Sequence, residues 1–113
     1  MIEREPQLFG SRNRTMVLLA VRLLGETFPS ELAVLLGLRL YSVQSILAAL
    51  EREAVVVSRM MGRTRLVALN QRYFAAKELD ALAWKLGQKD VVLRDLLGAR
   101  RRSPRRPGKP GAL

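Results

Sequence analysis

The stretch LLGLRLYSVQSIL, residues 35–47, constrains the fold most strongly, because it can form one apolar helix or two helices that meet at Gly37. Apolar residues recur at helical spacing beyond it and form one stripe: Val43, Ile46, Leu47, Leu50 and Ala54. The opposite side is polar or small and comprises Tyr41, Ser45, Ala48 and Arg52, flanked by Gln44 and Ser42. A helix over 40–54 with one apolar and one polar face, preceded by a glycine that permits a tight turn, favours two helices.

The remaining elements follow from the same kind of pattern. Ser11 is a suitable N-cap for a first helix, and Gly25 a suitable end for it. Valines on both sides of an MGR turn predict a hairpin. The expected helices are 12–25, 29–37, 40–54, 72–86 and 89–100, and the expected strands are 55–60 and 64–69. Three helices followed by a hairpin make a winged helix-turn-helix, so the predicted fold is mainly α with a small β hairpin, plus C-terminal helices.

This order of elements suggests four segments. They are an N-terminal arm (1–10), a winged helix-turn-helix domain expected to bind DNA (11–71), a C-terminal helical extension whose amphipathic helices are expected to form a dimer (72–100) and a basic tail (101–113). The last eleven residues contain three prolines and two glycines, which predicts a disordered tail.

Charge points to a polyanionic partner. The chain has 20 Lys and Arg against 10 Asp and Glu, and residues 100–113 hold six of the basic residues and no acid. Nucleic acid is the first expectation and an acidic membrane the second. The tail is expected to attract DNA without sequence preference and to speed association.

Several classes of site are excluded by composition. The chain has no Cys and no His, which removes zinc fingers, disulfides and the usual nucleophile–histidine pairs. No convergent acid pair suggests catalysis, and Glu51, Glu53, Asp80, Asp90 and Asp95 are interpreted as solvated helix faces. We therefore expect no enzyme activity, no metal and no cofactor. No apolar run is long enough to span a membrane, so a cytoplasmic, nucleoid-associated protein is expected.

The polar stripe and the arginines around it carry chemistry that suits DNA. Tyr, Ser and Gln can hydrogen-bond to base edges, and Gln can pair twice with adenine. None of these side chains is an arginine that reads guanine, so a modest sequence preference is expected. Six arginines are candidates for neutralising phosphates: Arg12, Arg14, Arg39, Arg59, Arg63 and Arg65.

Two stretches carry a family resemblance. ELAVLLGLRLYSVQSILAALEREAVV resembles the helix-turn-helix of ArsR/MarR-type winged helix-turn-helix transcriptional regulators, and GRTRLVALN resembles their wing. The similarity covers about 8–97 and is greatest to small stand-alone bacterial members. It implies a homodimeric DNA-binding transcriptional regulator. Four residues fall on its base-reading positions: Tyr41, Ser42, Gln44 and Ser45. Arg63 and Arg65 fall on the wing (59–65), where contact with the DNA backbone or minor groove is implied.

The sequence departs from this pattern at Arg39, which stands where many members have a capping Ser or Thr. An arginine cannot cap in that way, but it can reach a phosphate. Metal sensing, which some ArsR-type members carry out, is not expected without Cys or His.

The helices over 72–86 and 89–98 are amphipathic. Phe74 is expected on or near the apolar side of the first of them. The residues expected to pack in the core or in a dimer are Leu79, Leu82, Trp84, Leu86, Leu93 and Leu97.

The predicted partners are double-stranded DNA and a second copy of the chain, without a membrane, and nothing points to a small-molecule effector. The alternative function is a winged-helix module that binds nucleic acid without sequence preference or mediates protein assembly.

Overall fold

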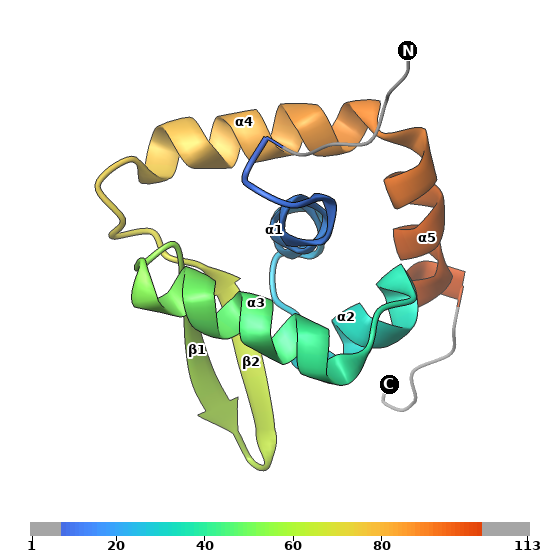
Figure 1. Ribbon diagram of the computed structural model, residues 1–113, viewed down its shortest axis with the longest axis horizontal. Helices are drawn as coiled ribbons and strands as arrows, with labels where there is room; N and C mark the ends of the chain where they lie inside the picture. Colours follow the sequence, from blue (N-terminus) through green and yellow to red (C-terminus); the bar gives the residue numbers. More distant parts are fainter. Residues whose placement is uncertain (1–7, 103–113) are drawn as a thin grey trace.

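The computed structural model describes residues 8–102, and these form five helices and one two-stranded sheet (Figure 1). The elements are α1 (Arg12–Leu24), α2 (Pro29–Leu36), α3 (Leu40–Arg52), β1 (Val56–Met61), β2 (Thr64–Leu69), α4 (Ala76–Lys89) and α5 (Val91–Arg102). The predicted fold class, mainly α with a small hairpin, is confirmed. Residues 1–7 of the predicted N-terminal arm and 103–113 of the predicted tail lie outside the described residues.

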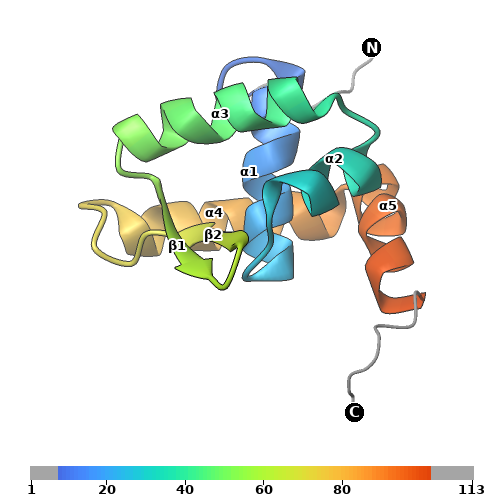
Figure 2. The same ribbon diagram turned by 90° about the horizontal axis from the view of Figure 1, so that it is seen from below.

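Helix α1 is the centre of the core. Its residues 15–21 are all buried, so apolar side chains surround the helix instead of lining one face. Helices α3 and α4 lie on opposite sides of it (Figures 1 and 2). The predicted limits of α1 are confirmed: the Ser11 hydroxyl accepts a hydrogen bond from the Arg14 N–H at 3.0 Å, and Gly25 follows the last turn.

The hairpin β1–β2 contains the predicted wing (59–65), and the whole hairpin is called the wing from here on. It is antiparallel and pairs Val56 with Leu69 at one end and Met61 with Thr64 at the other. Val56 and Val67 bury its base in the core. A backbone bridge with Thr27 extends the sheet, since the Thr27 N–H donates to the Val67 carbonyl and the Val67 N–H donates back. The wing is thus anchored at its base.

The segment before α4 differs from the prediction of a helix from residue 72. The Asn70 side-chain oxygen accepts a hydrogen bond from the Arg72 N–H, and the Asn70 amide donates to the Ala54 carbonyl. These bonds turn the chain locally, so α4 begins only at Ala76. The prediction for Phe74 is therefore wrong: Phe74 lies in the turn and is 90% exposed.

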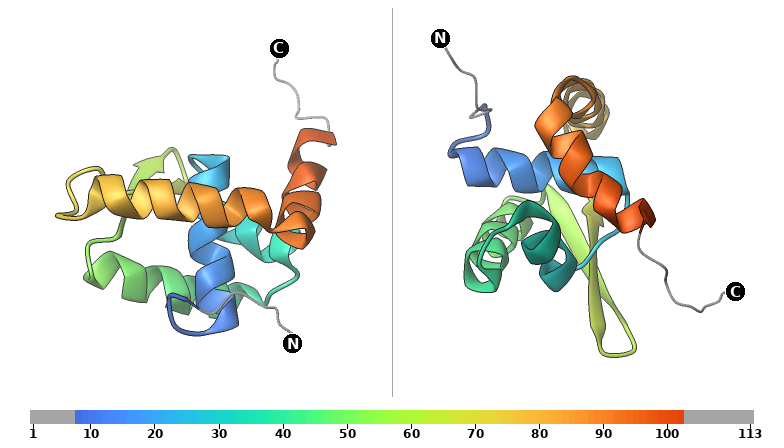
Figure 3. Two further views of the ribbon diagram at one scale, coloured as in Figure 1. Left: turned by 90° about the horizontal axis from the view of Figure 1, so that it is seen from above. Right: turned by 90° about the vertical axis from the view of Figure 1, so that its right-hand side faces the viewer.

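Helices α4 and α5 pack on the winged core of the same chain. Helix α4 covers α1 through Ala83 and Gly87, and α5 lies beside α2 (Figure 3) and buries Leu93 and Leu97. Leu79 and Leu86 are half-buried against this core.

The last turn of α5 is held by Arg100. The Arg100 guanidinium donates to the carbonyls of Leu24 and Glu26 and lies 3.1 Å from the Glu31 carboxylate.

Trp84 is not a core residue. It is 44% exposed, and the Arg22 guanidinium lies 4.6 Å from the centre of its ring. Arg22 is held there by Asp80, whose carboxylate accepts a hydrogen bond from the Arg22 Nε at 2.8 Å. Leu82 is also exposed on α4. Leu82 and Trp84 were expected in the core or in a dimer; they do not lie in the core of the chain, because α4 turns Ala83 and Gly87 toward α1. Their packing in a dimer stays a prediction.

None of the helices within residues 8–102 combines the length and the apolar composition needed to cross a membrane.

Candidate nucleic-acid interface

Gly37 makes the turn between α2 and α3. It has left-handed backbone angles, φ 68° and ψ 34°, and the Leu38 N–H bonds to the Ala33 carbonyl at 3.0 Å. This bond is the signature of a glycine-terminated helix, with Leu38 packed back toward the core. The two-helix interpretation of residues 35–47 is therefore confirmed.

Helix α3 begins without a side-chain cap. Arg39 occupies the N-cap position, its side chain makes no capping hydrogen bond, and the residue is exposed. The first turn contains no acid. The free N–H groups of this turn and the Arg39 guanidinium therefore make a positive helix start.

One face of α3 is buried and the other is exposed. Val43, Leu47 and Leu50 face the core, whereas Tyr41 is 78% exposed. Gln44 and Ser45 are exposed beside Tyr41, but Ser42 is half-buried at the edge of this face. The structure thus brings three of the four predicted base-reading side chains onto one free surface. Their role in reading bases stays a prediction.

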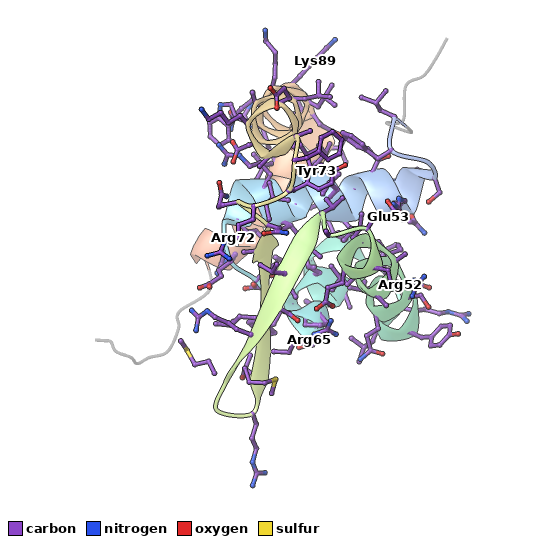
Figure 4. The ribbon with its side chains drawn as sticks, turned by 90° about the vertical axis from the view of Figure 1, so that its left-hand side faces the viewer. Arg52, Glu53, Arg65, Arg72, Tyr73 and Lys89 are labelled. Atoms are coloured by element: carbon purple, nitrogen blue, oxygen red, sulfur yellow. The ribbon has the colours of Figure 1, made fainter. Side chains whose placement is uncertain are left out.

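Arg65 is tied to α3. Its guanidinium forms an ion pair with Glu51 of α3, and its Nε donates to the Ser58 hydroxyl of β1 at 3.2 Å. The Ser58 hydroxyl donates in turn to Glu51 at 2.7 Å. Arg65 lies between the wing and α3 (Figure 4). Arg65 is therefore not a free cation, and Glu51 is not merely a solvated residue.

Two more of the predicted phosphate-binding arginines are ion-paired. Arg59 of the wing donates twice to Glu26, at 2.9 and 3.2 Å, and Arg14 of α1 lies 2.9 Å from the Glu53 carboxylate. Arg12 has an interaction partner as well. Folding brings acids distant in sequence beside Arg14 and Arg59, and the predicted phosphate contacts of these arginines stay a prediction.

Three exposed arginines of α3 and the wing have no ion pair with any described residue. Arg39 precedes α3, Arg52 is in its last turn, and Arg63 is in the turn at the tip of the wing. Arg52 was not among the predicted site residues, although its place on the polar stripe could have identified it. Arg39 and Arg52 thus place positive charge at the two ends of α3, and Arg63 places it at the tip of the wing.

The described residues include no group of three or more acids that could hold a metal ion. Asp90, predicted to be solvated, caps α5 by accepting a hydrogen bond from the Leu93 N–H at 3.0 Å.

Comparison of the chain with protein-family models, curated proteins and solved structures found no match.

Proposed function

We propose that this protein is a DNA-binding transcriptional regulator that reads the major groove with α3 and contacts the backbone or minor groove with the wing. The observation that carries the proposal is the exposed face of α3, where Tyr41, Gln44 and Ser45 lie with no acid in the first turn. At the two ends of the helix lie Arg39 and Arg52, which form no ion pair with a described residue. A helix of this length spans about 20 Å, and the major groove is wide enough to admit it.

The chemistry of this face supports a division of roles. Gln44 can form two hydrogen bonds with adenine, and Tyr41 and Ser45 can each bond to a base edge. Arg39, Arg52 and Arg63 can bind phosphates, which position a protein on DNA without reading its sequence. Binding through phosphates releases counterions, so affinity should fall steeply with salt.

The proposed regulator acts as a homodimer. Helices α4 and α5 leave several large apolar side chains exposed: Leu82, Trp84, Val91 and Val92. A symmetric dimer would bind two half-sites about 34 Å, one helical turn of DNA, apart. Sedimentation at tens of micromolar tests this part; a single monomeric species would contradict it.

The proposal is tested by selecting duplexes from a random pool and then measuring competition between the selected and random duplexes at physiological salt. The variant Y41A/S45A should lose the preference for the selected duplex while keeping the wild-type circular dichroism spectrum. The control variant K85A/Q88A changes two exposed residues of α4, on the other side of α1, and should keep the preference. Retained preference in Y41A/S45A would contradict the assignment of α3.

A second candidate function is binding of nucleic acid without sequence choice. It is favoured by one observation: the exposed centre of α3 carries Gln44 and Ser45, and no arginine that could read guanine. Equal affinity of the wild-type protein for selected and random duplexes would favour this candidate over the first.

A further inference from the structure

We propose that Glu26 and Glu51 are specificity determinants of this DNA interface, because each keeps one wing arginine paired within the chain until a DNA phosphate replaces the carboxylate. This inference rests on the proposed function. It gives the two acids a role in limiting attraction to DNA of any sequence.

The two ion pairs, Arg59–Glu26 and Arg65–Glu51, lie on opposite faces of the wing. Side chains alternate along a strand, so Ser58 and Arg59 of β1 point to opposite sides of the hairpin. Arg65 makes its bond to Ser58 and its ion pair with Glu51 on the side that faces α3. Arg59 pairs with Glu26, which lies in the connection between α1 and α2. Arg59 and Arg65 are therefore bound by two different neighbouring elements.

Both pairs remain accessible to solvent. The side chains of Arg59 and Glu26 are 55% and 46% exposed, and those of Arg65 and Glu51 are 35% and 34% exposed. Exposed ion pairs contribute little net free energy, because water also stabilises the separated charges. A phosphate oxygen can therefore take the place of either carboxylate when DNA approaches.

The consequence concerns random DNA. An arginine paired with a carboxylate presents no net charge to a distant phosphate, whereas a free arginine attracts every phosphate equally. The partner exchange happens only when a phosphate comes within hydrogen-bonding distance of Arg59 or Arg65. A duplex that fits the face of α3 holds its phosphates within that distance of Arg59 and Arg65. A duplex that does not fit keeps its phosphates farther away, so the wing adds little to its affinity.

The variants E26Q and E51Q test the inference. Each removes the charge that neutralises one arginine and keeps the shape of the side chain. The control is E78Q, which makes the same change of charge at an exposed residue of α4 that has no ion pair with a described residue. Affinity for a fluorescent random-sequence duplex is measured over a range of salt, together with affinity for a selected duplex.

Each freed arginine should engage one more phosphate on random DNA, which steepens the slope of log affinity against log salt by about 0.9. Affinity for the random duplex should rise severalfold, and the ratio of selected to random affinity should fall. E78Q should leave the slope and the ratio unchanged. If E51Q also loosens the wing, E26Q still provides the test, because the hydrogen bonds described for Glu26 go to Arg59 and Arg100 and not to α3.

Slopes and ratios in E26Q that equal those of E78Q would overturn the inference while leaving the proposed function standing. Absence of DNA binding by the wild-type protein at low salt would instead overturn the proposed function, and the inference with it.

Discussion

Glu51 of α3 and Arg65 of β2 form an ion pair, and the hydroxyl of Ser58 in β1 bonds to both of them. The helix that presents Tyr41 and Gln44 and the hairpin that carries Arg63 are therefore connected by side chains, in addition to the short link through Val55.

Replacing Ser58 with alanine should destabilise the protein by about 1 kcal/mol, because Glu51 and Arg65 each lose a hydrogen-bond partner. Urea unfolding followed by circular dichroism measures the change. S30A is the matched control, since Ser30 is exposed and should shift the free energy of unfolding by no more than about 0.5 kcal/mol. An S58A midpoint equal to that of S30A would argue against a contribution from this network.

Gly37→Ala should cost about 1–2 kcal/mol, because a side chain at φ 68° meets the carbonyl that follows it. No neighbouring atom crowds this position, so the penalty comes from the backbone alone. Gly37→Asn should cost less, since asparagine tolerates left-handed angles better. Thermal unfolding of both variants provides the comparison, and equal losses for alanine and asparagine would contradict this explanation.

Leu47→Ala should lower the free energy of unfolding by about 2–5 kcal/mol, because the side chain is fully buried and its loss leaves a cavity. Leu82→Ala on α4 removes the same atoms from a site that is 40% exposed, and its effect should be much smaller. Urea midpoints of the two variants measure the difference. Similar midpoints would mean that α3 does not pack on the core through this residue.

Arg63→Ala should weaken binding to selected and random duplexes by the same factor and reduce the salt slope by about 1, as expected for loss of one phosphate contact. Lys85→Ala on α4 removes an equal charge on the other side of α1 and should leave the slope unchanged. Titrations at several salt concentrations distinguish the two variants. A loss confined to the selected duplex would assign Arg63 to base reading instead.

Local signals predicted most of the secondary structure. Ser11 and Gly25 marked the limits of α1, and Gly37 marked the turn into α3, since caps and glycine turns depend on residues close in sequence. The start of α4 was missed because Asn70 bonds to Ala54, a contact between residues 16 positions apart.

The exposed face of α3 was predicted from periodicity, but the ion pairs of the arginines were not. Arg59 and Glu26 are 33 positions apart, and Arg14 and Glu53 are 39 apart. Nothing in a local pattern pairs residues over such distances, so the sequence showed the number of positive charges and not which of them are neutralised. Trp84 illustrates the same limit, because its position beneath Arg22 depends on how α4 lies across α1.

The Glu31 carboxylate in the first turn of α2 joins three parts of the chain. It accepts a hydrogen bond from the buried Thr27 hydroxyl at 2.7 Å and lies 3.1 Å from Arg100 of α5. Helix α2 leads through Gly37 directly into α3. The end of α5 and the proposed DNA-reading helix are therefore joined through one intervening helix, by a route that does not include the wing.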